Sequence, residues 1–508
     1  MKVVVIGSGM SGLTAGAYLA RAGHEVVVYE QFDAPGGVTA TVHQEGFGWD
    51  IGPLLVEGFA PGDKGRIILE ELGVSQRVPA VHEDRGLSMP KFALWKPKDY
   101  QGPYWRRERL KELFPSESQA LNRYYQFYDQ MIKLMGIARQ AESARGLAGL
   151  WLKLQLWLAF QPVKGKAKWN GGQLMDYYFT SPELKTLFLG IVADFVTAPS
   201  EFPSLGVPSI HLETAFDKRI PTYPSTRSAQ TAYTYILGGC QTLVDAVMGV
   251  VLENGGKLLT NTTVNRILIE NGRATGVELA DGHIEPADLV LASGGMQETF
   301  FDLVGRQHLS ADFIKQIESN LLMESVLMVQ LGIDFDPTRY QPAALCYYYN
   351  THDLEGSVKR LRTGEYHEGK EGLLIYVPSL HSPSLAPSGK YAVTIYTVAP
   401  DTLAVGSWTS RREELADKLV AEAEKYIPGL REHTLTRLVL TPEDYRARTH
   451  LKHHSFGGVP PVMGNQPPAH KTPIAGLWFI GAQSESGGAV INVMTGAQKV
   501  ARRILSSE

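Results

Sequence analysis

KVVVIGSGMSGLTAGAYLARAGHEVVVYEQFDAPGG, residues 2–37, is the stretch that decides the fold of this chain. Lys2 to Ile6 is a short, β-branched run that is typical of a buried parallel strand. A glycine turn follows, and then an Ala- and Leu-rich helical pattern from Leu13 to Ala22. Glu25 to Tyr29 is a second apolar strand, and Glu30 ends it. Strand, glycine turn, helix, strand and acid in this order predict a dinucleotide-binding βαβ unit.

The glycine turn assigns a physical role to each of its special residues. Gly7 permits the tight turn, Gly9 lets the backbone approach a pyrophosphate, and Gly12 lets the helix sit close to the strand. The first helical turn, which contains Ser11, offers free N–H groups and partial positive charge to phosphates. We expect Glu30 to accept hydrogen bonds from a ribose 2′-OH.

A second glycine-rich loop comes directly after this unit. Gly36 and Gly37 suit a loop that is pressed against a ligand by its backbone. No Lys or Arg occurs from 31 to 37, which disfavours NADP as the nucleotide. Alternation through Phe47, Trp49 and Ile51 then predicts a short strand that ends in a turn at Gly52-Pro53.

Two spaced motifs in this region carry a family resemblance. The first motif is Glu30-x5-Gly36-Gly37, and the second is Gly46-Phe47-x2-Asp50-x-Gly52-Pro53. Together they resemble the FAD-binding N-terminus of the phytoene desaturase and carotenoid isomerase family, which includes retinol saturase-like proteins. This family belongs to the amine-oxidase-like flavoproteins. The resemblance implies an α/β fold: a Rossmann-like FAD-binding domain with a discontinuous α+β substrate domain. Many members have an arginine right after Gly-Gly, where this chain has Val38. Thr39 and Thr41 could replace some of the polar contact that such an arginine makes, but not its charge.

The same resemblance extends to two later segments. Gly238-Gly239 before a predicted helix, Thr242 to Glu253, resembles the returning cofactor segment, and it implies that Val264 lies near the adenine, whether or not it is also a core valine. Near the C-terminus a strand ends at Gly481, and a glycine pair opens the final helix, which in the family faces the flavin pyrimidine. The predicted cofactor site is Gly7, Gly9, Ser11, Gly12, Glu30, Gly36, Gly37, Thr39, Gly52, Pro53, Val264, Gly481, Gly488 and Val490.

These segments divide the chain into alternating parts. We expect residues 1–90, 236–305 and 441–508 to form the FAD-binding domain, 306–440 a substrate-domain sheet with helices, and 91–235 a helical, substrate- and membrane-facing region. Strands are predicted at Leu321–Asp336 and Lys390–Ala399, and an amphipathic helix at Thr409–Tyr426.

The helical region contains two notable helices. The long helix predicted at Pro115–Ala144 carries a stripe of Tyr124, Tyr125, Phe127 and Tyr128, which at helical spacing predicts core packing, with tunnel lining as the alternative. Gly146 to Phe160 is apolar except for Lys153 and Gln155, and it is short of the ~20 residues that span a bilayer. It fits either a buried helix or a helix in a membrane interface, anchored by Trp151 and Trp157.

Composition excludes several classes of function. With 49 Lys+Arg against 53 Asp+Glu, the chain offers no electrostatic case for nucleic acid. Cys240 and Cys346 form neither a redox pair nor a zinc motif. Few cysteines and an N-terminus that runs straight into a strand favour a cytoplasmic protein, in peripheral membrane contact if 146–160 is interfacial. We predict no metal, with His450, His453 and His454 as packing or surface histidines.

The predicted function is an FAD-dependent oxidoreductase. A single nucleotide fingerprint favours FAD over NAD. The resemblance implies an apolar, polyene- or carotenoid-like substrate, and it leaves desaturase, isomerase and saturase open. No residue pattern singles out a catalytic group. A flavin amine oxidase, which needs an aromatic cage beside the flavin, and a non-catalytic prenyl-binding escort protein are the alternatives; intact glycines argue against the latter. The oligomeric state is open.

Overall fold

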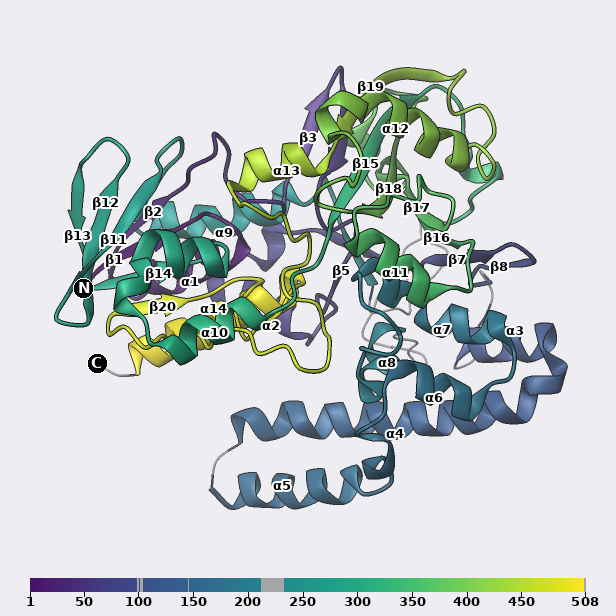
Figure 1. The fold of residues 1–508 in the computed structure, drawn as a ribbon, viewed down its shortest axis with the longest axis horizontal. Helices are drawn as coiled ribbons and strands as arrows, with labels where there is room; N and C mark the ends of the chain where they lie inside the picture. Colours follow the sequence, from purple (N-terminus) through teal and green to yellow (C-terminus); the bar gives the residue numbers. More distant parts are fainter. Residues whose placement is uncertain (98–99, 101–103, 145, 212–232, 507–508) are drawn as a thin grey trace.

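Figure 1 shows two sheet-containing halves side by side, with a helical lobe beneath the second. The computed structural model describes residues 1–97, 100, 104–144, 146–211 and 233–506. Both chain termini lie in the first half. The first half is built from three separate stretches of sequence, so residues hundreds of positions apart become neighbours.

The first half is organised around a parallel five-stranded sheet, as the βαβ prediction requires. Its order is β10 (Lys257–Leu259), β2 (Glu25–Tyr29), β1 (Lys2–Ile6), β14 (Leu289–Ala292) and β20 (Leu477–Phe479). One face of β1 and β2 packs against three helices: α1 (Met10–Arg21), α9 (Gln241–Glu253) and α14 (Val490–Leu505). The strands are apolar on both faces because both faces are covered.

An antiparallel meander covers the other face. It consists of β11 (Val264–Glu270), β12 (Arg273–Leu279) and β13 (Ile284–Pro286). Its turns fall at Asn271-Gly272 and at Asp281-Gly282, where Asn-Gly and Asp-Gly pairs favour tight hairpins. A π-helix, Glu298–Gly305, and α10 (Ala311–Ser319) complete this layer.

The second half is a seven-stranded mixed sheet. Its order is β19 (Thr434–Leu440), β15 (Ser325–Ile333), β18 (Tyr391–Ala399), β17 (Gly372–Tyr376), β16 (Leu345–Tyr349), β7 (Gly86–Met89) and β8 (Phe92–Leu94). One face packs against α12 (Trp408–Ala423), and the other is turned toward the cofactor half. β7 pairs in parallel with β16, so a strand from the predicted first segment extends this sheet.

Short elements join the two halves. β3 (Thr41–Gln44) and β4 (Phe47–Asp50) form a hairpin, and β5 (Val56–Glu57), β9 (Tyr233–Ile236) and β6 (Ala80–His82) form a small sheet. The helix α2 (Lys64–Leu72) packs against α14, and α11 (Leu354–Arg362) packs against α7 (Pro182–Asp194). The helix α13 (Pro442–Thr449) packs against α12, β15 and β19. The hairpin partner β3 was not predicted, because its sequence alternates weakly.

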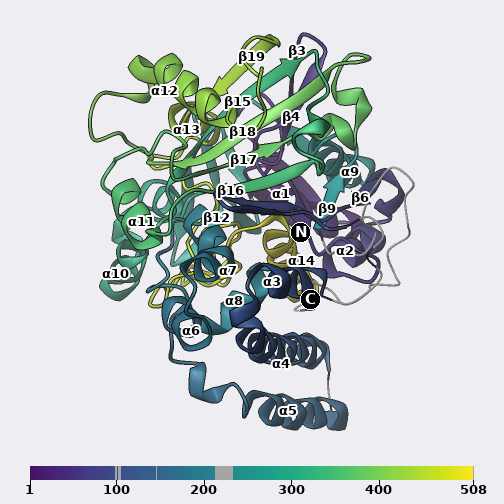
Figure 2. The same ribbon diagram turned by 90° about the vertical axis from the view of Figure 1, so that its right-hand side faces the viewer.

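The helical lobe is made of α3 (Trp105–Leu113), α4 (Ser118–Ser143), α5 (Gly146–Phe160), α6 (Gly171–Tyr178), α7 (Pro182–Asp194) and α8 (Val207–Ile210). The aromatic stripe of α4 is buried in its core, as predicted. Figures 1 and 2 both show α5 as the outermost helix, beyond α4. No helix in the described ranges is both long enough and apolar enough to cross a membrane.

Candidate functional site

The glycine turn between β1 and α1 shows why each glycine is there. A Cβ on Gly7, which has φ +92°, would lie 2.6 Å from Ser293 Oγ, and one on Gly12 would lie 2.1 Å from the Gly7 oxygen. A Cβ on Gly9 would meet no protein atom within 4 Å. The fold therefore requires Gly7 and Gly12, whereas the space beside Gly9 suits a ligand that approaches the backbone.

The Glu30 carboxylate closes this turn. It is buried and accepts hydrogen bonds from Ser8 N (2.8 Å), Ser8 Oγ (2.6 Å) and Phe32 N (2.9 Å). Because an ionised carboxylate has about four acceptor positions, Glu30 keeps capacity for a ribose hydroxyl. Val264 opens β11 nearby, since Thr262 N, two residues earlier, donates to the Glu30 carbonyl at 2.9 Å. Val264 is a buried core residue, as one of its two sequence interpretations predicts, and its place beside the adenine stays a prediction.

The second glycine loop lies directly on the first. Gly36 forms a parallel bridge with Gly9, and a Cβ on Gly37 would lie 3.6 Å from the Gly9 Cα. Thr39 is buried, and its N–H donates to the Gly36 carbonyl at 3.0 Å. This loop has no basic residue of its own, but α13 brings Arg448 to it: Arg448 Nε donates to the Gly37 oxygen at 2.6 Å. Sequence reasoning missed Arg448 because no local pattern marks it.

A buried aspartate joins the first segment to the returning helix. Asp50 Oδ1 accepts hydrogen bonds from Thr41 Oγ1 and Cys240 N, both at 2.7 Å, at the start of α9. Burial raises the pKa of Asp50 to about 6. The Thr41 hydroxyl is therefore used in a hydrogen bond within the protein. A Cβ on Gly52 would lie 2.1 Å from the Val38 oxygen, and the Pro53 carbonyl accepts from Cys240 Sγ at 3.2 Å.

The C-terminal segment meets the N-terminal turn. A Cβ on Gly481 would lie 3.4 Å from Ser11 Oγ and 3.1 Å from the Ser293 carbonyl oxygen. Gly488 packs against the Gly457 carbonyl, 1.9 Å from where its Cβ would be. Val490 is the first residue of α14, whose core positions share one cluster with those of α1. The two ends of the chain therefore adjoin at the amino ends of two helices, where backbone N–H groups and partial positive charge are available.

An apolar and aromatic surface separates the cofactor half from the seven-stranded sheet. Leu54, which follows Gly52-Pro53, packs in one cluster with the inward faces of β15 to β18, including Met328, Tyr376 and Tyr396. Tyr235 from β9 stacks on Tyr376, with ring centroids 5.8 Å apart. The residues next to the Gly52-Pro53 turn thus pack against a wall that is largely hydrocarbon.

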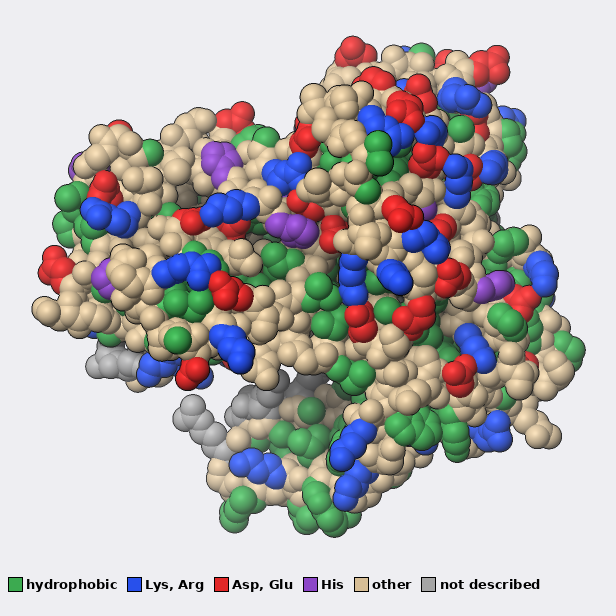
Figure 3. All heavy atoms as spheres, in the orientation of Figure 1, with side chains coloured by type: hydrophobic (Ala, Val, Ile, Leu, Met, Phe, Trp, Pro, Cys, Tyr) green, Lys and Arg blue, Asp and Glu red, His purple; other side chains and the backbone are tan. Residues whose placement is uncertain are grey.

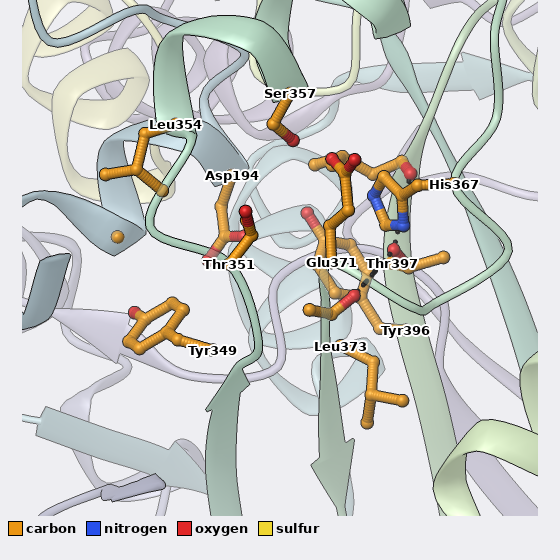
Figure 4. Close-up of a pocket in the computed structure, with 13 residues that line it drawn as sticks. Asp194, Tyr349, Thr351, Leu354, Ser357, His367, Glu371, Leu373, Tyr396 and Thr397 are labelled. Carbon is orange, nitrogen blue, oxygen red and sulfur yellow. Dashed lines mark hydrogen bonds between the residues drawn. The ribbon is translucent and has the colours of Figure 1, made fainter. Parts of the chain in front are cut away.

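Two charged groups border this surface, of which Arg85 is buried and Asp194 is half-buried. The Arg85 guanidinium is 2% exposed, lies 4.6 Å from the Tyr233 ring centroid and 5.0 Å from that of Tyr347, and donates to the Ile210 carbonyl. Within the described part of the chain, no carboxylate lies at ion-pair distance from it. Asp194, at the end of α7, lines a small pocket with Tyr349 and Tyr396 (Figure 4). Burial raises the pKa of Asp194 to about 7, and its Oδ2 has no hydrogen-bond partner among the residues that the structure describes.

Two of the clustered histidines make hydrogen bonds within the protein. His454 is buried, stacks on Tyr445 at 4.8 Å and bonds to Ser325 Oγ at 2.8 Å; burial lowers its pKa to about 3. His453 Nε2 bonds to the Met323 carbonyl at 2.8 Å. Among the residues that the structure describes, no group of three or more His, Cys, Asp or Glu side chains is arranged for a metal ion.

Comparison with known proteins identifies the class. The model of the flavin containing amine oxidoreductase family matches residues 10–505. Prolycopene isomerase 2 from an Oncidium hybrid is 25% identical over 99% of this chain and 83% of its own length. Phytoene desaturase (lycopene-forming) from Pseudescherichia vulneris is 24% identical over 98% of both chains. Mouse pyridine nucleotide-disulfide oxidoreductase domain-containing protein 2 is 26% identical over 96% of this chain and 90% of its own length.

Solved structures agree at the level of the fold. An oxidoreductase from Methanosarcina mazei superposes with a TM-score of 0.65, at 20% identity, over 99% of this chain and 100% of its own. A triple mutant of putrescine oxidase superposes with a TM-score of 0.62, at 13% identity, over 100% of this chain and 99% of its own. This chain therefore shares its fold with these two proteins, which confirms the predicted fold class.

The chain belongs to the flavin containing amine oxidoreductase family. It is an FAD-dependent oxidoreductase with relatives named as phytoene desaturases and prolycopene isomerases, which confirms the predicted cofactor, class of enzyme and family resemblance. Because it is an enzyme of this family, the alternative of a non-catalytic escort protein is set aside.

Proposed function

We propose that this enzyme acts on a long apolar, polyene-like substrate, either by desaturation with hydride transfer or by redox-neutral isomerisation. The observation that carries the proposal is the wall of Met328, Tyr376, Tyr396 and their neighbours, which packs directly against Leu54 beside the Gly52-Pro53 turn. A hydrocarbon chain is held by such a surface through burial of apolar area, about 25 cal/mol per Å². The relatives named for carotenoid substrates support the same choice.

We assign the FAD site to the residues predicted from the sequence. The α1 amino end and the space beside Gly9 would hold the pyrophosphate, and Glu30 the ribose. The Val490 end of α14 would place backbone N–H groups toward the reacting ring, where they would stabilise negative charge on the reduced cofactor. When bound, FAD supplies the hydride acceptor, and the protein supplies position and environment.

Two charged groups lie beside this apolar cluster. Arg85 contacts Tyr347, which packs in the same cluster as Tyr396, and Asp194 lines a pocket with Tyr396. Asp194 is a candidate proton acceptor for the carbon next to the one that loses hydride, since a pKa near 7 matches the requirement of a general base.

The substrate can be tested with the holoprotein under anaerobic conditions. We expect a polyene in detergent to bleach the flavin absorbance or, for an isomerase, to change double-bond geometry once the flavin is reduced. Chromatography of the products separates desaturation, saturation and isomerisation. Diamines and monoamines serve as the matched comparison. Bleaching by an amine, with polyenes inert in both assays, would replace this proposal with the amine oxidase alternative.

We further propose that α5 contacts a membrane surface from which an apolar substrate is taken. Its outward side chains follow helical spacing and are strongly exposed: Leu147 (85%), Leu150 (64%), Trp151 (58%), Leu154 (46%), Trp157 (59%) and Leu158 (53%). In Figure 3 hydrophobic side chains gather at the lowest edge of the molecule with Lys and Arg beside them. Residues 146–170 contain four lysines and no Asp or Glu, which suits an anionic lipid surface.

Vesicle binding tests the membrane contact. We expect the protein to sediment with vesicles that contain anionic phospholipid, and the double variant Trp151→Ser/Trp157→Ser to lose most of that binding. Ile284→Ser on β13 and Val405→Ser remove exposed apolar groups elsewhere, at 55% and 76% exposure, and serve as controls. Equal binding by the tryptophan variant and the controls would exclude α5 as the contact.

A further inference from the structure

The glycine turn and the loop that follows it contain no positively charged side chain. The first 37 residues contain only two basic side chains, Lys2 and Arg21, and neither lies in the turn or in the following glycine loop. Glu30 and Asp33 add negative charge at the same loop. An FAD diphosphate carries two further negative charges, so a cation from elsewhere in the chain would add to the binding that the helix end provides.

The structure brings such a cation from the other end of the molecule. Arg448, in the last turn of α13, donates from Nε to the Gly37 carbonyl at 2.6 Å, and its guanidinium lies 4.5 Å from the centroid of the Phe32 ring. Both contacts are to the loop that follows Glu30. Gly37 in turn packs on the Gly9 Cα, at the residue that precedes α1. The guanidinium is therefore held on the loop that packs against the residue preceding α1, the helix end that we propose for the phosphates.

Arg448 is held in place from several sides. The neighbouring Thr449 carbonyl accepts a hydrogen bond from Gln31 Nε2 at 2.7 Å. Together with the bond from Arg448 to Gly37, this links α13 to the loop after Glu30 at two points. One helical turn earlier, the Tyr445 hydroxyl donates to the Ile51 carbonyl at 2.8 Å. The helix begins with a reciprocal capping arrangement of Thr441 and Asp444. Such fixed donors bind an anion with little loss of side-chain entropy.

The chemistry of the side chain fits a diphosphate. A guanidinium has five N–H donors in a planar fork, and the contact with Gly37 uses the Nε one. The four N–H groups on the two terminal nitrogens can meet phosphate oxygens in a bidentate way, which Lys cannot imitate. Partial burial lowers the pKa of Arg448, while the Glu30 and Asp33 carboxylates act in the opposite direction. Arg remains charged at any physiological pH.

We propose that Arg448 binds the FAD diphosphate and supplies the positive charge that neither the Gly7–Gly12 turn nor the Gly36-Gly37 loop contains. The inference rests on the proposed placement of FAD at the Gly7–Gly12 turn. It assigns a cofactor role to α13, a helix that follows the last strand of the substrate sheet. Docking of FAD would then fix α13 to the glycine loop and so link the two halves of the enzyme through the cofactor.

Flavin titration of the apoprotein tests this assignment. We expect Arg448→Met to weaken FAD binding about 10- to 100-fold, the loss expected for one charge-assisted contact. Arg448→Lys should recover part of the loss, because it keeps the charge without the fork. Arg431→Met, an equally charged change at an exposed residue that pairs with Glu424, is the control. The affinity of the native protein should fall with added salt more steeply than that of Arg448→Met.

Two outcomes would overturn the assignment. FAD binding by Arg448→Met that equals the Arg431→Met control removes the role. A loss of binding that Lys does not recover, that is insensitive to salt and that comes with a lower melting temperature of the apoprotein shows a purely structural tether. Gly9→Ala separates failure of this inference from failure of the site itself: if that variant loses FAD while Arg448→Met keeps it, the site stands and only the arginine contact is wrong.

Discussion

Gly9→Ala tests the cofactor site most directly, because the structure separates its effect on folding from its effect on binding. Gly9 has φ −62° and ψ 168°, which any residue can adopt, and its Cβ would meet no protein atom within 4 Å. The apoprotein should therefore tolerate the methyl group. Replacing Gly by Ala where the backbone permits it stabilises a protein by about 0.4–1 kcal/mol through the unfolded state.

Ligand binding should respond in the opposite direction. If the pyrophosphate lies against the Gly9 backbone, an added methyl group forces a displacement of the kind that costs about 1–3 kcal/mol in a packed site. That cost corresponds to roughly 5- to 150-fold weaker FAD binding, at about 1.4 kcal/mol per factor of ten. Gly12→Ala is the contrasting variant: its Cβ would lie 2.1 Å from the Gly7 oxygen, so the apoprotein itself should be destabilised by at least about 2 kcal/mol.

Two measurements decide the matter. Urea unfolding of the apoproteins should place Gly9→Ala at or above the native stability and Gly12→Ala clearly below it. Titration with FAD, followed by flavin fluorescence, should show the loss of affinity for Gly9→Ala. Native-like FAD binding by Gly9→Ala would refute the placement of the pyrophosphate at this turn, whatever the behaviour of Gly12→Ala.

Three further predictions concern other parts of the site. Glu30→Ala should weaken FAD retention by about 1–3 kcal/mol and also lower the melting temperature of the apoprotein, since three hydrogen bonds to the loop are lost; unchanged flavin occupancy after dialysis would contradict its ribose role. Ala489→Gly should raise stability by about 1 kcal/mol in urea melts, because Ala489 has φ +76°, and no gain would mean that the strain is absent. Burial raises the pKa of Asp194 from 3.8 to about 7, so the native protein should lose stability relative to Asp194→Asn as pH rises through 7, by at least about 1 kcal/mol between pH 5 and pH 8.5. Parallel pH profiles of stability for the two proteins would show that Asp194 is not buried in this way.

Much of the cofactor half was predictable because its signals are local. A buried strand, a glycine turn and a helix are each encoded within a few residues, and Lys2–Ile6, Met10–Arg21 and Glu25–Tyr29 form as the pattern indicates. The strands at Ser325–Ile333 and Tyr391–Ala399 were found for the same reason. The pairing of β7 with β16 was not, because the partner of an edge strand depends on the packing of distant elements.

The two apolar helices show where periodicity stops being informative. In α4 the aromatic stripe alternates with polar residues, so its burial could be predicted. In α5 nearly every residue is apolar, so no face is distinguished by sequence. Only the position of the helix outside α4 leaves side chains such as Leu147, Trp151 and Trp157 exposed. Exposure is a property of neighbours, which a uniform segment does not specify.

The amino-acid sequence by itself determined the βαβ unit and the pattern that predicts a dinucleotide at its first turn, since Gly9, Glu30 and a helix end all lie within 37 residues. Only the tertiary structure decided what surrounds that turn. Gly481 meets Ser11, and Arg448 meets Gly37 across 411 positions of chain. Such contacts are set by how sheets and helices pack as whole bodies, and no short stretch of residues carries that information.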